Sequence, residues 1–581
     1  MIKCKVVCFF TIFFTGLIFG LSAQQLHDPN DRLYKDIDVW AVQGYITQAL
    51  PMIRPYPLQV VDEFLADVVD NGDDDAAAKA QRYRDALLLG NGPRNSGTAL
   101  YANDRGVLHA GVTGSLEGLD DDVSVLGAPF VDGTLRLKDW LTGSFSMYVY
   151  GSNRSPQEGY NAPGTYSPYP DMISDTSDVG KLKITQNWTS ALAVGTSGFY
   201  FQSGLIRSSF GPIYDNGVIV GPQAPRAGHF SVVYREPKWS FEMLWLELTA
   251  TDTIGSARDS DKGRYSGKHL VSHIYSFRPV PSFEVSFFET MVWGPRIDPL
   301  YILPFAMLFA SQSMADFGDN AFMGLLVRWH FARNLQFLTQ FYVDDFHFND
   351  MVKFKFNTKY KFAAEMGFVW APKEGPLRSL SADYTAIVPY MYTHIYDLDS
   401  TTYGDRYPSQ PGYTGPHANY LDYSHVGKNL GADLEPNSDR ISVRSAWKTL
   451  PNLELGLSAY FIRHGNASEN RLKDELMDGE YHDGSIFDDG SNDGEFTDAY
   501  GNSKGKKDNY DNNYRKLHFL TQSTLETKLA GGITLTWYLP SRLGEFSLNA
   551  EYVAEYGWNR GLIRNNNSLM HYWAVGGTYR F

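Results

Sequence analysis

Apolar and polar side chains alternate strictly through the twelve residues EFSLNAEYVAEY, from Glu545 to Tyr556. Successive side chains of a β-strand point to opposite faces, so this strand would have one apolar face and one strongly polar face. The apolar face carries Phe546, Leu548, Ala550, Tyr552, Ala554 and Tyr556, and only Val553 interrupts the polar one. A chain built from such strands has to cover its apolar faces with a second sheet or with lipid.

Similar segments recur from Gly106 to the end of the chain. Four of the clearest are SFEMLWLELTATD (240–252), SFEVSFFETMVW (282–293), NLQFLTQFYVDD (334–345) and ITLTWYL (533–539). About eighteen strands can be counted after residue 105, many of about ten residues, the length that a tilted strand needs to cross a bilayer. The alternative is a sandwich or a propeller, but sandwich strands are normally shorter and occur in domains of about 100 residues. We therefore predict an all-β fold, a transmembrane antiparallel β-barrel of about 18 strands.

The first 23 residues predict export. Lys3 and Lys5 flank the start of an apolar run of about fifteen residues, and a small-residue cleavage signal ends at Ala23. A retained membrane anchor is the alternative, but the run is short for a membrane span. Cleavage of this signal peptide (1–23) would remove both cysteines, Cys4 and Cys8. We expect an exported protein of the cell outer membrane without disulfides.

Composition narrows the possible partners. The hydrophobic share of 43% is low for 581 residues buried on both faces of every strand, and the aromatic share of 15% suits rings at a membrane interface. Acidic residues outnumber basic ones by 66 to 51, for a formal net charge of −15. A groove for nucleic acid would oppose that field, so we expect no nucleic-acid partner.

The pattern of the chain changes near residue 105. Residues 24–105 place apolar side chains at helical spacing and predict a small helical segment, which we expect in the periplasm. The barrel, residues 106–581, has short turns and three long connections at 151–180, 395–438 and 464–513, which we expect to be extracellular. Its closing strand MHYWAVGGTYRF ends on Phe581 and looks like the C-terminal signature that the barrel-assembly machinery recognises. We expect a monomer in contact with outer-membrane lipid.

Signatures of catalysis and of bound cofactors are scarce. The sequence contains no G-x-S-x-G, no H-E-x-x-H, no P-loop and no dinucleotide fingerprint, so we expect a protein that is not an enzyme. Asp489, Ser491 and Asp493, followed by Gly494, match the first half of a calcium loop. Tyr500 stands where that loop needs a bidentate Glu, and a solvated acidic loop is the alternative. Calcium is therefore the one cofactor that we consider.

Two long connections are rich in tyrosine, whose ring can stack on a sugar while its hydroxyl forms hydrogen bonds. These side chains could equally pack the loops against themselves. They are Tyr160, Tyr166 and Tyr169 in the first loop, and Tyr403, Tyr407, Tyr413, Tyr420 and Tyr423 in the second.

Several longer stretches resemble the Wzi-like capsule assembly family of outer-membrane proteins. In chain order they are LYKDIDVWAVQGYI with RPYP, SSFGPIYDNGVIVGPQAPRAGHF, FGDNAFMGLLVRWHFARNLQFLTQFYVDDF, and YSHVGKNLGADLEPNSDRI. The resemblance implies an eighteen-stranded barrel with helices near its mouth, acting as a surface lectin for capsular polysaccharide. With the tyrosine-rich loops, it leads us to predict stacking by Tyr407, Tyr413 and Tyr420. The predicted polar contacts are Arg207, Arg226, Asp344 and Asp345.

Two other functions remain open from the sequence. A porin needs a continuous wet path, and the N-terminal helices together with bulky lumen residues such as Tyr342 and Tyr538 favour a closed lumen instead. An adhesin for proteins would use the same loops as a lectin. Between Asp474 and Asp498 the longest loop has ten acids and no Lys or Arg, so an acidic exterior would repel an acidic capsule.

Overall fold

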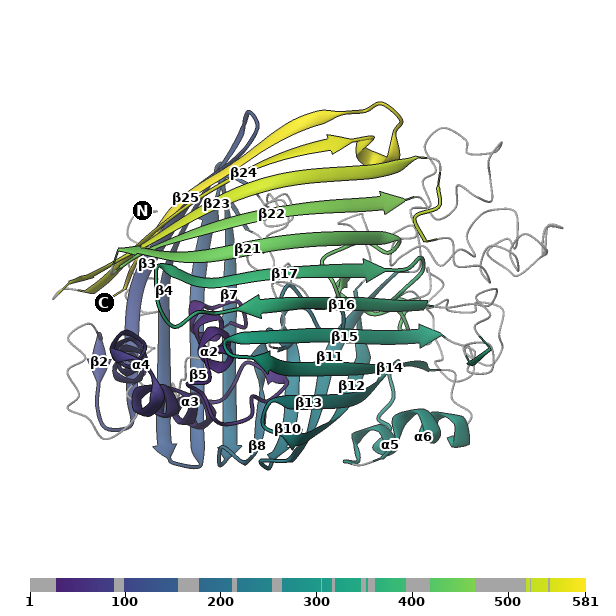
Figure 1. Ribbon diagram of the computed structural model, residues 1–581, viewed down its shortest axis with the longest axis horizontal. Coiled ribbons are helices and arrows are strands. Elements are labelled where there is room, and N and C mark those ends of the chain that lie inside the picture. Colours follow the sequence, from purple (N-terminus) through teal and green to yellow (C-terminus); the bar gives the residue numbers. More distant parts are fainter. Residues whose placement is uncertain are drawn as a thin grey trace, which may run out of the picture.

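Eighteen long antiparallel strands close into a barrel, and the first of them pairs with the last (Figure 1). The computed structural model describes residues 28–87, 99–154, 177–211, 217–252, 264–304, 306–315, 319–345, 352–353, 361–392, 418–450, 452–465, 519–522, 524–541 and 544–580. The barrel strands are β3 (Gly106–Leu119), β4 (Asp122–Lys138), β5 (Leu141–Ser152), β7 (Leu182–Gly195), β8 (Phe199–Ile206), β10 (Ala227–Arg235), β11 (Trp239–Asp252), β12 (Arg264–Val280), β13 (Phe283–Trp293), β14 (Asn320–Ala332), β15 (Leu335–Asp345), β16 (Lys361–Trp370), β17 (Leu377–Ile387), β21 (Ser438–Leu450), β22 (Leu453–Gly465), β23 (Leu525–Ser541), β24 (Gly544–Trp558) and β25 (Ser568–Arg580). The predicted fold class is confirmed.

Strand β24 shows which face of the wall is which. Tyr552 and Tyr556 are exposed on the outside of the barrel, whereas Glu555 is buried on the inside. Val553, the exception to the alternation, also points inward and is buried. The outer wall is apolar around the barrel, with exposed Trp239, Phe277, Leu325, Trp329, Phe341, Phe368, Ile441, Leu457, Ile533, Trp537 and Val575. An apolar outer face is what a lipid-embedded barrel requires.

The connections divide the barrel into two ends. At one end, strands are joined by short turns such as those after β10, β14 and β23, and at the other end lie the longer connections. This asymmetry is typical of outer-membrane barrels, in which the short turns face the periplasm. No helix among the described residues is both long and apolar enough to cross a membrane.

Three helices lie at the end with the short turns: α2 (Arg32–Val42), α3 (Leu58–Asn71) and α4 (Asp74–Ala86) (Figure 1). Asp31 and Asp73 cap α2 and α4, because each carboxylate accepts backbone N–H groups of the first turn. The apolar sides of the helices form one core that includes Tyr200 and Val233 from the inner barrel wall. The helices therefore pack against the inner wall at this mouth, and we call them the helical plug.

A second apolar core fills the barrel interior beyond the plug. Segments from two connections turn inward and pack on the inner faces of β11 to β17. The inward segments contribute Phe210, Val218, Ile219, Val220, Ala224, Val388, Met391, Tyr392, Tyr423, Leu430, Ala432 and Leu434. A ribbon of two short strands, β1 (Ile53–Arg54) and β9 (Ser209–Phe210), joins the plug to this lumen core.

The remaining described elements are short. Three short strands pair with barrel strands: β2 (Tyr101–Ala102) with β3, β6 (Ser177–Val179) with β7, and β18 (Ala418–Asn419) with β11. In addition, β19 (Ser424–His425) pairs with β20 (Lys428–Asn429). Helices α5 (Pro299–Ile302) and α6 (Leu308–Ala315) connect β13 to β14, and a 3-10 turn, Arg560–Leu562, follows β24.

Candidate functional site

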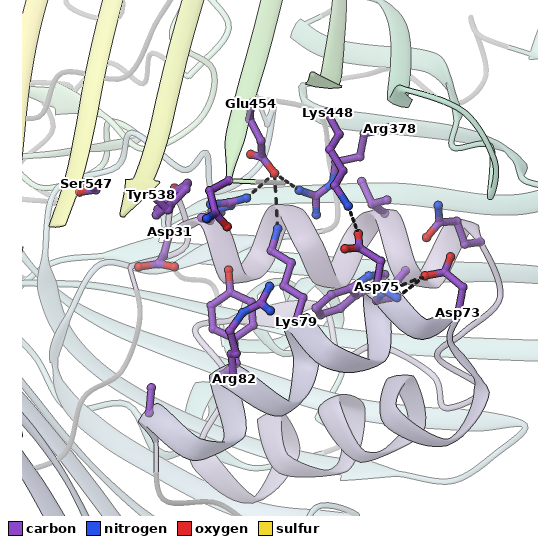
Figure 2. A pocket seen from close by; sticks show the side chains of 18 of the residues that line it. Asp31, Asp73, Asp75, Lys79, Arg82, Arg378, Lys448, Glu454, Tyr538 and Ser547 are labelled. Carbon is purple, nitrogen blue, oxygen red and sulfur yellow. Dashed lines mark hydrogen bonds and ion pairs between the residues drawn. The ribbon is translucent and has the colours of Figure 1, made fainter. Parts of the chain in front are cut away.

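A cleft of about 450 Å³ lies between the helical plug and the rim of the barrel (Figure 2). Helices α2 and α4 form one wall. The opposite wall comes from the turn between β16 and β17, from the ends of β21 and β23, and from the starts of β22 and β24. The cleft is thus built where the short turns meet the plug.

Charged side chains dominate the lining. Seven are basic, namely Arg32, Lys79, Arg82, Lys373, Arg378, Lys448 and Arg580, and four are acidic, namely Asp31, Asp73, Asp75 and Glu454. Basic side chains outnumber acidic ones in the lining by three, while two carboxylates outside it, Asp36 and Asp132, pair with lining cations. The whole chain carries −15, so the cleft is a local positive region in an acidic protein.

Glu454 lies at the centre of the cleft, where Arg32, Lys79 and Arg378 converge on its carboxylate (Figure 2). A second carboxylate, Asp36, is buried behind them. It lies 2.8 Å from Lys79 Nζ, forms an ion pair with Arg378, and accepts a hydrogen bond from the Tyr83 hydroxyl at 2.7 Å. Three cations thus share two carboxylates.

Of the remaining cations, Arg580 forms an ion pair with Asp132 at 2.7 Å, whereas the other three have weaker partners or none among the described residues. Lys448 pairs with Asp75 at 2.5 Å, and their side chains are 37% and 66% exposed. The Lys373 ammonium lies 4.2 Å from the centre of the Tyr45 ring. Arg82 is exposed, and no described residue pairs with it. These side chains could rearrange around a negatively charged ligand at little cost.

Lys79 has a pKa close to neutral pH. Burial, and after it the positive charge of Arg32, lowers the pKa of Lys79 to about 7, and Glu454 offsets this shift only in part. The lining contains no histidine and no cysteine. The arrangement is therefore suited to holding a carboxylate or a phosphate by charge and hydrogen bonds.

Two predicted polar contacts, Arg207 and Arg226, are occupied within the protein. Both side chains are buried. Arg207 Nη1 donates to the carbonyl oxygens of Gln223 and Ala224 at 3.0 and 2.7 Å, and its Nε lies 3.1 Å from Asp28. The Arg226 guanidinium donates to a backbone carbonyl of β7. These two arginines hold the inward-turned segment in place.

The other predicted residues are spread over the molecule. Asp344 forms a buried ion pair with Lys361 at 3.5 Å, and Asp345 pairs with Lys361 in the backbone ladder at the end of β15, five strands from β10. Tyr420 is partly buried and precedes Tyr423 of the lumen core by three residues. Tyr407, Tyr413, Asp489, Ser491 and Asp493 lie outside the described residues. The structure does not bring the described members into one surface, and their binding roles stay predictions.

Sequence reasoning missed the cleft. The signal that could have indicated it is the contrast between the basic residues in or beside the short turns, Lys373, Arg378 and Lys448, and the acidic long loop. Opposite charge at the two ends of a barrel suggests different partners on the two sides.

Among the described residues, no group of three or more metal-binding side chains is assembled.

Comparison with known proteins adds information on the fold. No family model matches the chain, and no curated protein matches its sequence. Among solved structures, Wzi of Escherichia coli, an outer membrane protein involved in group 1 capsule assembly and a carbohydrate-binding β-barrel, is similar with a TM-score of 0.50 and 12% identity. The match covers 95% of this chain and 98% of Wzi.

Other similar structures are OccD3 and OprD of Pseudomonas aeruginosa. OccD3 has a TM-score of 0.41, 9% identity, and coverage of 83% of this chain and 93% of its own. OprD has a TM-score of 0.40, 7% identity, and coverage of 83% and 95%. The likeness to Wzi shows the fold of an outer-membrane β-barrel, and membership of the Wzi-like family stays a prediction.

Proposed function

We propose that this protein is an outer-membrane barrel, closed to diffusion, that binds a surface polysaccharide without cleaving it. The observation that carries the proposal is the lumen core together with the helical plug. A diffusion channel needs a continuous wet path, and two packed layers between its ends oppose one. The barrel is then a scaffold for binding at its ends.

Aromatic contacts inside the lumen core support the interpretation that the barrel lumen is closed permanently rather than occasionally. The Tyr342 ring on β15 stacks on Phe322 of β14 at 5.0 Å and lies 5.7 Å from Tyr423, which belongs to an inward segment. Tyr392 stacks on Tyr423 at 5.5 Å, and its hydroxyl donates to the Val218 carbonyl at 2.6 Å. Wall and inward segments thus interlock through aromatic rings. Such packing is stabilising and specific.

Carbohydrate as the ligand rests on two further supports. One is the likeness in overall fold to a carbohydrate-binding barrel. The other is the set of tyrosines in the long connections, whose rings can stack on sugars. Stacking on one ring contributes on the order of 1 kcal/mol, so several rings are needed for firm retention of a polymer.

The test measures polysaccharide binding and conductance on the same purified protein. We expect binding to a glycan array, loss of binding when Tyr407, Tyr413 and Tyr420 are all changed to Ala, and retention when they are changed to Phe. We also expect no steady conductance in a planar bilayer. Absence of glycan binding would reject the lectin function, and steady conductance would favour the porin alternative. Binding of proteins independent of glycan would favour an adhesin.

A second binding role is supported by the cleft. We propose that its excess positive charge holds an anionic group, a carboxylate or a phosphate, on the periplasmic side. Inorganic phosphate and a uronic acid oligomer are suitable probes. Changing both Arg82 and Lys373 to Gln should weaken either probe several-fold. Changing the exposed Arg564, in the connection between β24 and β25, to Gln is the matched control.

A further inference from the structure

The connection between β13 and β14 folds back over the outside of the barrel (Figure 1). Its helices α5 and α6 place Tyr301 and Leu308 on the outer wall. From Pro299 to Ala315 the connection has no charged residue, whereas the longest connection is strongly acidic. The outward wall residues that pack in the same cluster are Val232, Phe241, Met243, Val271, Met291 and Trp293.

The register of the sheet shows at which height along the barrel wall α5 and α6 lie, and we call these two helices the cover. Phe287 pairs with the exposed Leu325, and one outward row nearer the long connections Glu289 pairs with Met323. Below this level the same outer face is open, at Phe277 and Trp329. The eleven residues of β13 rise about 25 Å along the barrel axis at the usual tilt, which matches the height of a lipid-facing band. The helices thus cover the outer half of that band.

Two polar side chains of the wall lie beneath the cover. His273 and Glu289 occupy outward positions in adjacent strands, yet both are fully buried. The Phe309 N–H donates to Glu289 at 3.2 Å, and His273 Nδ1 lies 3.0 Å from the Ala306 carbonyl oxygen. Ionisable groups on the lipid face of a barrel destabilise it. The two helices replace lipid at these positions and provide the hydrogen bonds that lipid cannot.

The outer side of the cover is itself apolar. Its exposed side chains are Ile297, Leu300, Leu303, Met307, Phe309 and Met314, and Met314 is 89% exposed. Charged residues stand only at the borders, where Arg296 pairs with Asp319 at 2.9 Å and with Asp298 at 3.3 Å. Tyr301 also donates to Asp319 at 2.7 Å. An uncharged segment bracketed by an ion-pair cluster fits hydrocarbon with a polar boundary next to it.

We propose that α5 and α6 are embedded in the outer leaflet and contact the acyl chains of its lipids. The occupant is lipid because this surface continues the exposed apolar wall at Leu325 and Phe341 without a polar rim between them. A docking face for a protein would normally carry polar groups around an apolar centre. The barrel therefore has a helical wall segment inside the membrane.

The test uses single-cysteine variants, because removal of the signal peptide leaves no native cysteine to be labelled. Met314→Cys and Met307→Cys carry a fluorescent label in the refolded protein in vesicles. Leu325→Cys on β14 is the control for the lipid-facing wall, and Arg564→Cys is the control for water. Quenchers are spin-labelled lipids in the membrane and iodide in the buffer.

We expect lipid-borne quenching at Met314→Cys and Met307→Cys to equal that at Leu325→Cys and to exceed that at Arg564→Cys at least threefold. Iodide should show the opposite order. Iodide quenching as strong as at Arg564→Cys would place the helices in water and overturn the proposal. Protection from both quenchers would also overturn it, because a protein would then cover the face.

Discussion

Glu454 is the residue on which the charge balance of the cleft depends most. It is the shared partner of Arg32, Lys79 and Arg378, and from β22 it joins two helices of the plug, α2 and α4, to β17 of the rim. Removing one partner of a buried charge cluster leaves the others without compensation. Its side chain retains 24% exposure, which reduces that cost.

We predict that Glu454→Gln destabilises docking of the plug by ~2 kcal/mol and leaves the barrel folded. Limited proteolysis of the refolded protein should cut α2 to α4 at lower urea than in the wild type, while heat-dependent migration on a gel is unchanged. Asp75→Asn, which breaks only the solvent-open pair with Lys448, is the control and should cost less than ~1 kcal/mol. Equal protease resistance of wild type and Glu454→Gln would contradict this role.

Lys79 makes anion binding in the cleft depend on pH, with weaker binding at higher pH. Its pKa is lowered to about 7, so it is charged below pH 7 and loses its proton as pH rises through that value. The charged groups that face it are Arg32, Arg82, Asp36 and Glu454. Binding of inorganic phosphate should therefore weaken about fivefold from pH 6 to pH 8.5, equivalent to ~1 kcal/mol, after correction for the phosphate's own titration. Lys79→Arg, which keeps its charge, should remove this step; an unchanged profile would show that Lys79 does not contribute.

Among the secondary-structure elements, the β1–β9 ribbon connects the two packed layers. Ile53 pairs with Phe210, and the Glu242 carboxylate on β11 accepts hydrogen bonds from the N–H groups of Met52 and Ile53 at 2.9 Å. The ribbon thus has a fixed attachment to the inner wall. Its position between plug and lumen core makes it the element that holds one layer to the other.

We predict that Glu242→Ala loosens this attachment, because two buried N–H groups lose their acceptor at a cost of ~1–3 kcal/mol each. Hydrogen exchange of residues 50–56 should become faster, with the barrel strands unaffected. Glu236→Ala, at an exposed turn position where the side chain only accepts from the Tyr234 hydroxyl, is the control. Identical exchange in Glu242→Ala and wild type would show that the ribbon is held by other contacts.

Strands with one polar, lumen-facing side and one apolar, lipid-facing side were predictable, because their polar and apolar side chains alternate. This is why β24 was recognised, down to the inward Val553. The alternation is weaker where both faces are covered, although β11 was still predicted as a strand. On β11, Phe241 and Met243 lie under α5 and α6 while Leu244 and Leu246 enter the lumen core, so only two glutamates interrupt the apolar run from Phe241 to Leu248.

Helices α5 and α6 were missed for another reason. They are short, four and eight residues, so neither is long enough to show a clear helical period in the sequence. The inward turn of the segments near Arg207 and Arg226 is decided by long-range packing. Arg207, Arg226 and Asp344 were predicted as ligand contacts with the help of the family resemblance, which does not indicate their burial. In the structure Arg207 and Arg226 donate to backbone carbonyls and Asp344 pairs with Lys361, and their binding roles stay predictions.

The whole molecule is a membrane barrel whose lumen is closed at two successive levels. Its two ends differ in charge. The plug covers the mouth with the short turns and brings a positive cleft with it. The lumen core closes the interior at a second level, where inward segments of two connections from the other end pack on the inner faces of β11 to β17. Two seals in series mean that opening either one alone should not produce a pore.

We therefore predict that removal of the plug, residues 28–51 and 57–87, leaves the barrel non-conducting, because the lumen core and the ribbon remain. Replacing both inward segments of the lumen core, residues 217–224 and 388–434, with Gly-Ser linkers in wild type should also give no steady conductance, because the plug remains. Only the two changes together should produce stepwise conductance in a planar bilayer. Heat-dependent gel migration checks that each variant still forms a barrel. Steady conductance after removal of the plug alone would contradict the sealing role of the lumen core, and conductance after the loop change alone would contradict that of the plug.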